Sequence, residues 1–340
     1  MTVKPSARAA ALKARALAPR DLEGVITIDA ALSGRTRQAY FERRLAAAQR
    51  RPQLHAQFAL EEGGALAGYV LGRVLLGEFG RTAPAMRLEQ IGVRPGLQGH
   101  GYGAALGEAL EVETRRRGLR ELRTASLWRE HGMLRYLDAS GWSLARDVVL
   151  ECALAESALG GAAEHTVAVP ARDRPADQHD YGVPGQDDTE TVARDTAEVH
   201  SLAASDLEDV ARIDRRLTGR DRSDYIRARL EDALLESAIR LSLIAHKENT
   251  CAGFLMASAD YGGFGRTEPV ALLDTIGIDP AFARQGVGRA LLSQLFLNLR
   301  ALDIERVETV VGLNNLDLLG FLASAGFHPG ERIAFAKTLA

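Results

Sequence analysis

The chain of 340 residues contains one stretch of sequence twice, 185 positions apart. Residues 28–45 read IDAALSGRTRQAYFERRL, and residues 213–230 read IDRRLTGRDRSDYIRARL. The same spacing, without a gap, relates residues 77–106 to residues 262–291. Chance would not keep one register through both regular elements and loops, so the sequence predicts two tandem copies of one domain. A period of this length is far too long for the stacked units of a solenoid.

A change of composition separates the two copies. Residues 156–195 are dense in Pro, Gly and Asp and follow neither the period of a strand nor that of a helix. This composition is typical of an extended linker. We therefore predict a first domain at residues 1–155, a linker at 156–195 and a second domain at 196–340. At about 150 residues each, both domains are large enough to bury a core of their own.

Within each copy, strand and helix periods alternate in the same order. In the first copy, helical spacing after Asp21 and again up to Leu45 predicts two helices, followed by strands at 54–60, 67–75 and 88–93. A helix, a strand at 119–126, a short helix and a final pair of strands complete the copy. The order β-α-α-β-β-β-α-β-α-β-β predicts an α/β (mixed α+β) fold, with a twisted mixed sheet flanked by helices in each copy.

Charge and cysteine content exclude several classes of function. With 42 basic and 45 acidic residues, the chain lacks the positive field that gathers nucleic acid or anionic lipid, and no apolar run is long enough to span a bilayer. The basic, Ala-rich N-terminus has no secretory core and suggests a frayed lead-in or a transit peptide. Cys152 and Cys251 form neither a disulfide framework nor a metal spacing, so we expect a cytoplasmic protein without a metal site.

A glycine-rich turn follows the third strand of each copy and opens a helix. The first copy reads VRPGLQGHGYGAAL at residues 93–106, and the second reads IDPAFARQGVGRAL at residues 278–291. Such a turn leaves several backbone N–H groups unpaired at the positive end of a helix, where they bind phosphate. No Gly-Lys-Ser/Thr follows, and Leu106 stands where a dinucleotide fingerprint needs its third glycine, so neither a Walker loop nor a Rossmann site is predicted. A turn without a ligand is the alternative.

These residues resemble the GNAT superfamily of acyl-CoA-dependent N-acyltransferases. Gln98 to Gly103 meet its loop pattern Q/R-x-x-G-x-G/A in full, whereas the second copy has Ala283 at the first position. The resemblance implies that acetyl-CoA is the acyl donor, with its diphosphate on the loop amides and its pantetheine arm along the preceding strand. The residues so assigned are Ile91, Val93, Gln98, Gly99, His100, Gly101, Tyr102, Gly103 and Ala104, with Ile276, Ile278, Arg284, Gln285, Gly286, Val287, Gly288 and Arg289 in the second copy.

Glu89 and Asp274 occupy equivalent positions on the strand that the resemblance places beside the acyl group. Each is a candidate base for the acceptor amine, directly or through water; a surface charge or a salt bridge to a nearby arginine is the alternative. Tyr136 stands where many members of the family carry a tyrosine that serves as the acid, and the second copy has Phe321 there. Packing of an aromatic ring against the sheet explains both residues equally well.

A further set of repeated residues falls in the regions that line the acceptor cleft of the superfamily. Arg35 and Arg37 are candidates to recognise a carboxylate or phosphate of the acceptor, and an intradomain Asp–Arg pair that fixes the helix turn is the alternative. The full set of candidate acceptor residues is Arg35, Arg37, Phe79, Arg220, Arg222 and Phe264.

Two functions remain open for the chain as a whole. The first is transfer of an acetyl group to an amine, of a small molecule or of a protein lysine. The second is a module that binds acyl-CoA, in which one copy, more readily the C-terminal one, is structural or sensory. An intramolecular pseudo-dimer of the two copies is a further expectation.

Overall fold

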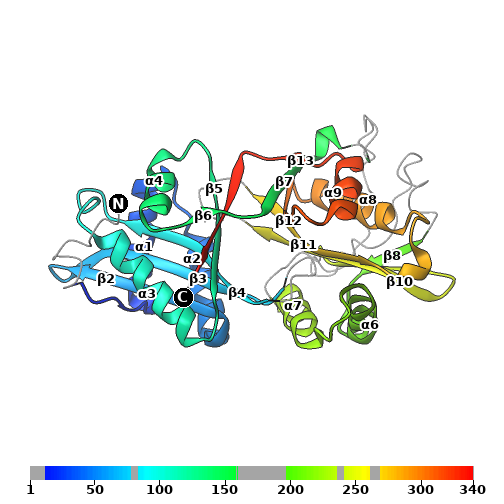
Figure 1. Ribbon diagram of the computed structural model, residues 1–340, viewed down its shortest axis with the longest axis horizontal. Helices are drawn as coiled ribbons and strands as arrows, with labels where there is room; N and C mark the ends of the chain where they lie inside the picture. The colour runs from blue at the N-terminus through cyan, green and yellow to red at the C-terminus, as the bar shows by residue number, and fades with distance from the viewer. Residues whose placement is uncertain are drawn as a thin grey trace, which may run out of the picture.

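The computed structural model describes residues 12–77, 83–157, 159, 197–235, 241–260 and 269–339. Their strands form two seven-stranded mixed sheets that lie side by side, with helices around them (Figure 1). The predicted α/β class, with one mixed sheet for each copy, is confirmed. The predicted linker at 156–195 falls almost entirely outside the described residues.

Both copies have the predicted order of elements, apart from short 3-10 turns. The first copy contains β1 (Arg15–Ala16), α1 (Leu22–Ser33), α2 (Gln38–Arg50), β2 (His55–Glu62), β3 (Ala65–Leu75), β4 (Ala85–Val93), α3 (Tyr102–Arg116), β5 (Glu121–Leu127), α4 (His131–Ala139), β6 (Ser143–Leu144) and β7 (Asp147–Ala153). The second copy contains β8 (Glu198–Ser201), α6 (Leu207–Thr218), α7 (Ser223–Leu235), β9 (Leu243–Lys247), β10 (Thr250–Asp260), β11 (Val270–Ile278), α8 (Val287–Arg300), β12 (Arg306–Gly312), α9 (Leu316–Ser324), β13 (His328–Pro329) and β14 (Arg332–Thr338).

Helices cover both faces of the first sheet. Tyr69 and Leu71 of β3 pack against the buried faces of α1 and α2. Val70 and Val74 of the same strand belong to the core under α3, with Leu106. This division follows from the alternation of side chains along a strand. Each leucine or valine buried in these two layers stabilises the fold by about 1.5–3 kcal/mol.

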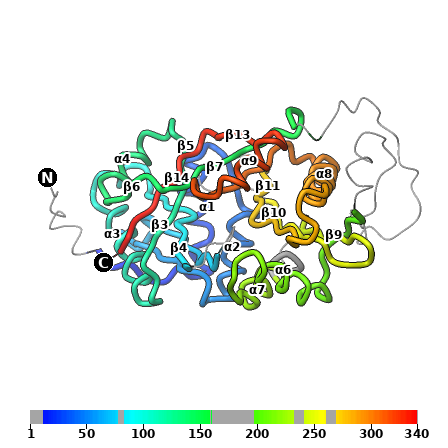
Figure 2. Tube along the Cα trace, turned by 45° about the vertical axis from the view of Figure 1, so that its right-hand side comes forward, coloured from blue at the N-terminus to red at the C-terminus, as the bar shows by residue number. Residues whose placement is uncertain are grey.

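Each copy gives its last long strand to the sheet of the other copy. The first sheet has the order β1-β2-β3-β4-β5-β14-β6, and the second has the order β13-β7-β12-β11-β10-β9-β8. β14 pairs antiparallel with β5, and β7 pairs antiparallel with β12, over seven register pairs each. In Figure 2 the red β14 segment lies beside β6 of the first copy. The predicted boundaries at 155 and 196 follow the sequence repeat. Each sheet, however, contains one long strand that comes from the other side of these boundaries.

The connections before the exchanged strands are short and do not form tight hairpin turns. Ala145 and Arg146 join β6 to β7, and neither has a positive φ. A two-residue hairpin of the common types needs at least one positive φ, so this connection is not a tight hairpin turn, and the chain continues into the second sheet. Gly330 and Glu331 join β13 to β14 in the same way.

Candidate functional site

The glycine-rich turns have a positive φ at the same two positions in both copies, the last position before the helix and the second before that. Gly99 and Gly101 have φ values of 77° and 89°, and Gly101 immediately precedes the first residue of α3. Gly286 holds the equivalent place before α8 with a φ of 83°. Arg284 corresponds to Gly99 and adopts a φ of 62°, which is uncommon for a residue with a side chain. The second copy therefore has a positive φ at this position even though arginine stands there instead of glycine.

The backbone at the start of α3 and α8 presents free donors. The first helical hydrogen bonds are donated by the N–H groups of Ala105 and Ala290, to the carbonyl oxygens of Gly101 and Gly286, both at 3.0 Å. Within the described parts of the chain, the N–H groups of the three residues before Ala105, and of the three before Ala290, donate to no backbone carbonyl. Three donors at the positive end of a helix dipole form an anion cradle.

Beside each turn, two parallel strands part. β4 continues to Val93, but its register with β5 ends at the pair Arg87–Arg123. At the point of parting, the Thr124 hydroxyl donates to the carbonyl oxygen of Leu88 at 3.0 Å. In the second sheet, the Thr309 hydroxyl donates to the carbonyl oxygen of Leu273 at 2.8 Å. The rest of β4 and β11 thus has one edge without a strand partner in the described structure, and this edge leads to the glycine-rich turn.

Glu89 and Asp274 both lie in a β-bulge, a placement that the sequence pattern did not reveal. Leu71 pairs with Gln90 and Gly72 with Leu88, which leaves Glu89 without a register partner. In the second sheet Asp274 is skipped in the same way. A bulge redirects a side chain. Here it turns the carboxylate of Glu89 toward α2 and that of Asp274 toward α7.

Each of these carboxylates forms an ion pair with an equivalent arginine. Glu89 Oε1 lies 3.3 Å from Nη1 of Arg44 on α2, and Asp274 pairs with Arg229 on α7. The salt bridge that the sequence left open is therefore present in both copies. Burial would raise the pKa of Glu89, but the positive charges of Arg44, Arg73 and Arg87 outweigh it and lower the pKa. Glu89 is consequently a buried carboxylate that remains ionised at neutral pH.

Tyr136 packs against the helix that carries the anion cradle. Its hydroxyl donates to the carbonyl oxygen of Gly103 at 3.2 Å, and a Cβ added to Gly103 would lie 3.3 Å from its ring. Burial raises the pKa of Tyr136 to about 12. In the second copy the Phe321 ring meets Gly288 in the same manner, since a Cβ added to Gly288 would lie 3.0 Å from that ring. These contacts favour the packing interpretation of both aromatic residues.

The repeated Asp–Arg pairs are intradomain ion pairs, the alternative that the sequence left open. Arg37 Nε donates to Asp29 at 2.8 Å, and Arg222 Nε donates to Asp214 at 2.9 Å. Arg222 also donates to the carbonyl oxygen of Gly77, so this pair of the second copy holds the chain just after β3 of the first. Two other candidates, Arg35 and Arg220, are exposed and directly follow the glycines that end α1 and α6. The last two, Phe79 and Phe264, lie outside the described residues.

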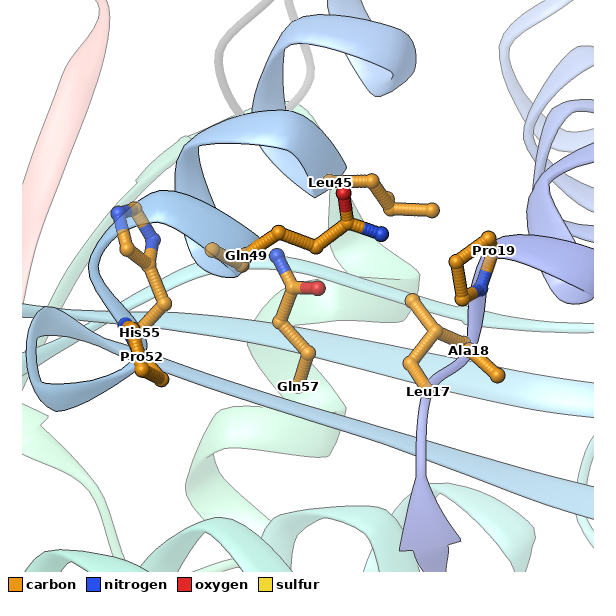
Figure 3. A pocket seen from close by; sticks show the side chains of 9 residues that line it. Leu17, Ala18, Pro19, Leu45, Gln49, Pro52, His55 and Gln57 are labelled. Atoms are coloured by element: carbon orange, nitrogen blue, oxygen red, sulfur yellow. The ribbon is translucent and has the colours of Figure 1, made fainter.

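A separate pocket of about 170 Å³ lies between the end of α2, β2 and the chain before α1. Figure 3 shows Leu17 and Leu45 toward one end and the His55 ring at the other. Its lining residues are Leu17, Ala18, Pro19, Leu45, Ala48, Gln49, Pro52, His55 and Gln57. None of them comes from β4, α3 or α4, so this pocket is distinct from the cradle.

Neither a metal site nor a membrane span is found in the described part of the chain. No group of three or more His, Cys, Asp or Glu side chains there is arranged to hold a metal ion. None of its helices combines the length and the apolar character needed to cross a bilayer.

The comparisons with known proteins agree with this arrangement. The model of the acetyltransferase (GNAT) family matches residues 24–133 and 207–327. A mycothiol acetyltransferase from Kineococcus radiotolerans is 30% identical over 237 residues, which cover 69% of this chain and 67% of that protein.

Two solved structures share the fold over 96% of this chain. A tandem GNAT protein from the clavulanic acid biosynthesis pathway is 17% identical, with a TM-score of 0.60 and 98% of its own chain covered. A GCN5-related glucosamine N-acetyltransferase region of a fungal multi-domain β-N-acetylglucosaminidase is 12% identical, with a TM-score of 0.61; this chain spans 38% of that one. The chain belongs to the acetyltransferase (GNAT) family and is an acyltransferase with two tandem GNAT domains.

Proposed function

We propose that this protein is an N-acetyltransferase that uses acetyl-CoA to acetylate an amine, either of a small molecule or of a protein lysine. The observation that carries the proposal is the cradle of free N–H groups before Ala105 and before Ala290, each beside a strand pair that parts. The name of the curated relative, mycothiol acetyltransferase, supports acetyl as the transferred group.

The residues present fit acetyl-CoA. The diphosphate would be held by the amides of residues 98–104 in the first copy and 284–289 in the second, where no Cβ of Gly101 or Gly286 stands in the way. The unpaired edges of β4 near Ile91 and Val93, and of β11 near Ile276 and Ile278, would pair with the amides of the pantetheine arm. When bound, acetyl-CoA supplies an acyl thioester, whose carbon forms a bond to the amine nitrogen as the bond to sulfur breaks.

The chain itself has to manage the proton of the amine. We propose Glu89 in the first copy and Asp274 in the second for this role, because a bulge places each beside the parting strands. A carboxylate with a lowered pKa stays ionised and holds an ammonium or a water better than it removes a proton unaided. The proton therefore leaves through water at this carboxylate. The thiolate is neutralised from solvent or by Tyr136.

The two copies also support a second function, in which one of them binds acyl-CoA without turnover. Phe321 lacks the hydroxyl of Tyr136, and the loop of the second copy has Ala283 where the first has Gln98. The exchanged strands support an intramolecular pseudo-dimer for either function. Because the described cysteines are buried free thiols, we propose a reducing cytoplasm as the compartment.

The test is release of free thiol from acetyl-CoA by the full-length chain against a panel of amines, with the acetylated product identified by mass spectrometry. Glu89→Gln and Asp274→Asn, made singly, assign turnover to a copy. We expect one of the two to lower kcat by about 10²-fold or more, the scale of a lost proton acceptor, without changing acetyl-CoA affinity. Acetyl-CoA binding without thiol release for any amine would instead support a module that binds acyl-CoA without turnover.

A further inference from the structure

Three arginines stand directly beside one another across the first sheet. Arg73 of β3 is the register partner of Arg87 of β4, which in turn is the register partner of Arg123 of β5. His55 of β2, at the end of the pocket in Figure 3, is opposite Arg73. All three arginines are half-buried. We refer to Arg73, Arg87 and Arg123 as the arginine row.

The row shares the face of the sheet that carries Glu89. Tyr69 and Leu71 of β3 face α1 and α2, so the alternation of the strand turns Arg73 to the same side. Glu89 reaches Arg44 of α2 on this side. The pair Arg87–Arg123 is also the last before β4 and β5 part. Glu89 lies two positions after Arg87, a distance along the strand of roughly 6–7 Å.

The second sheet shows that the fold does not require this row. At the equivalent positions, Ser258 pairs with Leu272, and Leu272 pairs with Glu308. The next partner in that sheet is Glu151, whereas Ala336 takes its place in the first. One sheet thus has three cations where its duplicate has two neutral residues and a carboxylate.

Like charges directly opposite each other in a sheet lower its stability. Carboxylates near the row balance part of the charge, since Glu121 accepts from Arg123 at 2.6 Å and the positive charges of Arg73 and Arg87 act on the carboxylate of Glu89. An arrangement that costs stability in one copy and is absent from the other indicates a ligand-binding role rather than a structural one.

We propose that the arginine row binds the anionic group, a carboxylate or a phosphate, of the amine that the first copy acetylates. This inference rests on the proposed function. The planar guanidinium groups match both anions through paired hydrogen bonds. With the amine at Glu89, the acceptor is a compact molecule whose nitrogen lies roughly 6–7 Å from its anionic group, the spacing of two positions along the strand. The second copy, with Glu308 and Glu151 in its row, does not select such an acceptor.

The experiment compares acceptors in matched pairs on the full-length chain. Phosphoethanolamine is paired with ethanolamine, and 4-aminobutyrate with 4-aminobutyramide, so that phosphate and carboxylate are tested separately. The variants Arg73→Ser and Arg87→Leu each introduce the residue that the second sheet already accommodates at that position. We expect the wild-type chain to prefer at least one charged member, and each variant to raise KM for it about tenfold or more, the scale of a lost charge-assisted hydrogen bond.

Two controls separate binding from folding. Arg116→Leu removes an exposed arginine of α3, on the opposite face of the sheet. This variant should leave the KM of the charged acceptor and the KM of the neutral acceptor unchanged. Arg87→Lys keeps the charge but loses the planar fork, and should raise KM less than Arg87→Leu does. The KM for acetyl-CoA and the thermal midpoint of each variant show that the donor site and the fold are intact.

Calorimetric titration of the acceptors into chain saturated with CoA distinguishes the possible failures. Suppose that no acceptor causes thiol release, yet the wild-type chain binds a charged acceptor more tightly than its neutral partner and Arg87→Leu does not. The proposed acyl transfer would then be wrong, while the proposed anion site would be supported. If thiol is released but charged and neutral members have the same KM in wild type and variants, the arginine row is not an acceptor site. The absence of both a binding and a kinetic preference would overturn the inference in any case.

Discussion

Cys152 and Val307 face each other as register partners in the second sheet, although they come from different copies of the repeat. Both side chains are fully buried in the core of that sheet. If β7 remained in its own sheet, Cys152 would take the place that Lys337 of β14 occupies, opposite Leu122. This one cysteine therefore reports on which sheet β7 has joined.

The variant Val307→Cys should form an intrachain disulfide with Cys152, because antiparallel register partners bring the two Cβ atoms within about 4.5–5.5 Å. Burial raises the pKa of the Cys152 thiol to about 11, so the bond is best formed during oxidative refolding. Peptide mapping by mass spectrometry detects it. Leu122→Cys is the matched control, and a disulfide between Cys152 and the cysteine introduced by that control would mean that the strands are not exchanged.

Tyr136→Phe tests whether this hydroxyl acts in catalysis. Since its hydroxyl is engaged by the Gly103 carbonyl and Phe321 fills the equivalent place, we expect kcat to fall by less than about threefold, far from the 10²-fold or more of a lost general acid. Steady-state thiol release measures the change. A loss of 10²-fold or more at unchanged acetyl-CoA affinity would instead make Tyr136 the acid.

Gly107 offers an independent check on the same packing. A Cβ at this position would lie 2.6 Å from the Tyr136 hydroxyl oxygen, whereas the second copy combines Phe321 with a buried leucine, Leu292, at the equivalent site. Gly107→Ala should therefore lower the free energy of unfolding of the wild-type chain. In the Tyr136→Phe variant the same substitution should cost at least about 1 kcal/mol less. Chemical denaturation of the four chains gives the coupling, and strictly additive effects would argue against this contact.

The sequence predicted the order of elements and the glycine turns because both depend on local features, namely hydrophobic period and positive φ. It could not predict the strand exchange. The edges of β5 and β12 come from the same repeated sequence, so nothing in the pattern tells β7 which of them to join. The two short connections do not decide it either: Ala145-Arg146 carries no turn signal, whereas Pro329-Gly330 does, and both lead into an exchanged strand.

Around the candidate site, the repeat contained a signal that the sequence-based predictions did not use. Arg44 and Arg229 recur at equivalent positions and prove to be the partners of Glu89 and Asp274. The arginine row had no such signal, because Arg73, Arg87 and Arg123 are far apart in the chain and differ from their counterparts in the second copy. Only the strand register brings them together.

The end of α3 provides a pH-dependent contribution to stability. Hydrogen bonds from Arg116, opposed by burial and reinforced by Arg117, lower the pKa of Glu113 to about 2. Arg117 also donates to the carbonyl oxygens of Gln53 and His55, at 2.7 and 2.6 Å, which fixes α3 to the start of β2.

Because the pKa of Glu113 is lower in the folded chain than its ordinary value of 4.5, its contribution is complete above about pH 4.5 and is lost as the pH falls toward 2. Glu113→Gln should cost about 1–2 kcal/mol of unfolding free energy at pH 7, and the difference from wild type should shrink between pH 4.5 and 2. Denaturation at several pH values measures it. Glu108→Gln, on the exposed side of α3, should cost less than about 0.5 kcal/mol at every pH, and a Glu113 effect that did not depend on pH would refute this origin.

The most direct test of the acyl-CoA assignment is the stoichiometry of acetyl-CoA binding to the full-length chain by calorimetry. We expect two sites in the wild-type chain, one site in Gly101→Val, one in Gly286→Val, and none in the double variant. Gly96→Val is the matched control, because Gly96 has nearly the same φ (86°, against 89° for Gly101) but lies before the cradle, and it should keep both sites. Undiminished binding of two acetyl-CoA molecules by a folded double variant would show that the glycine-rich turns do not hold the coenzyme.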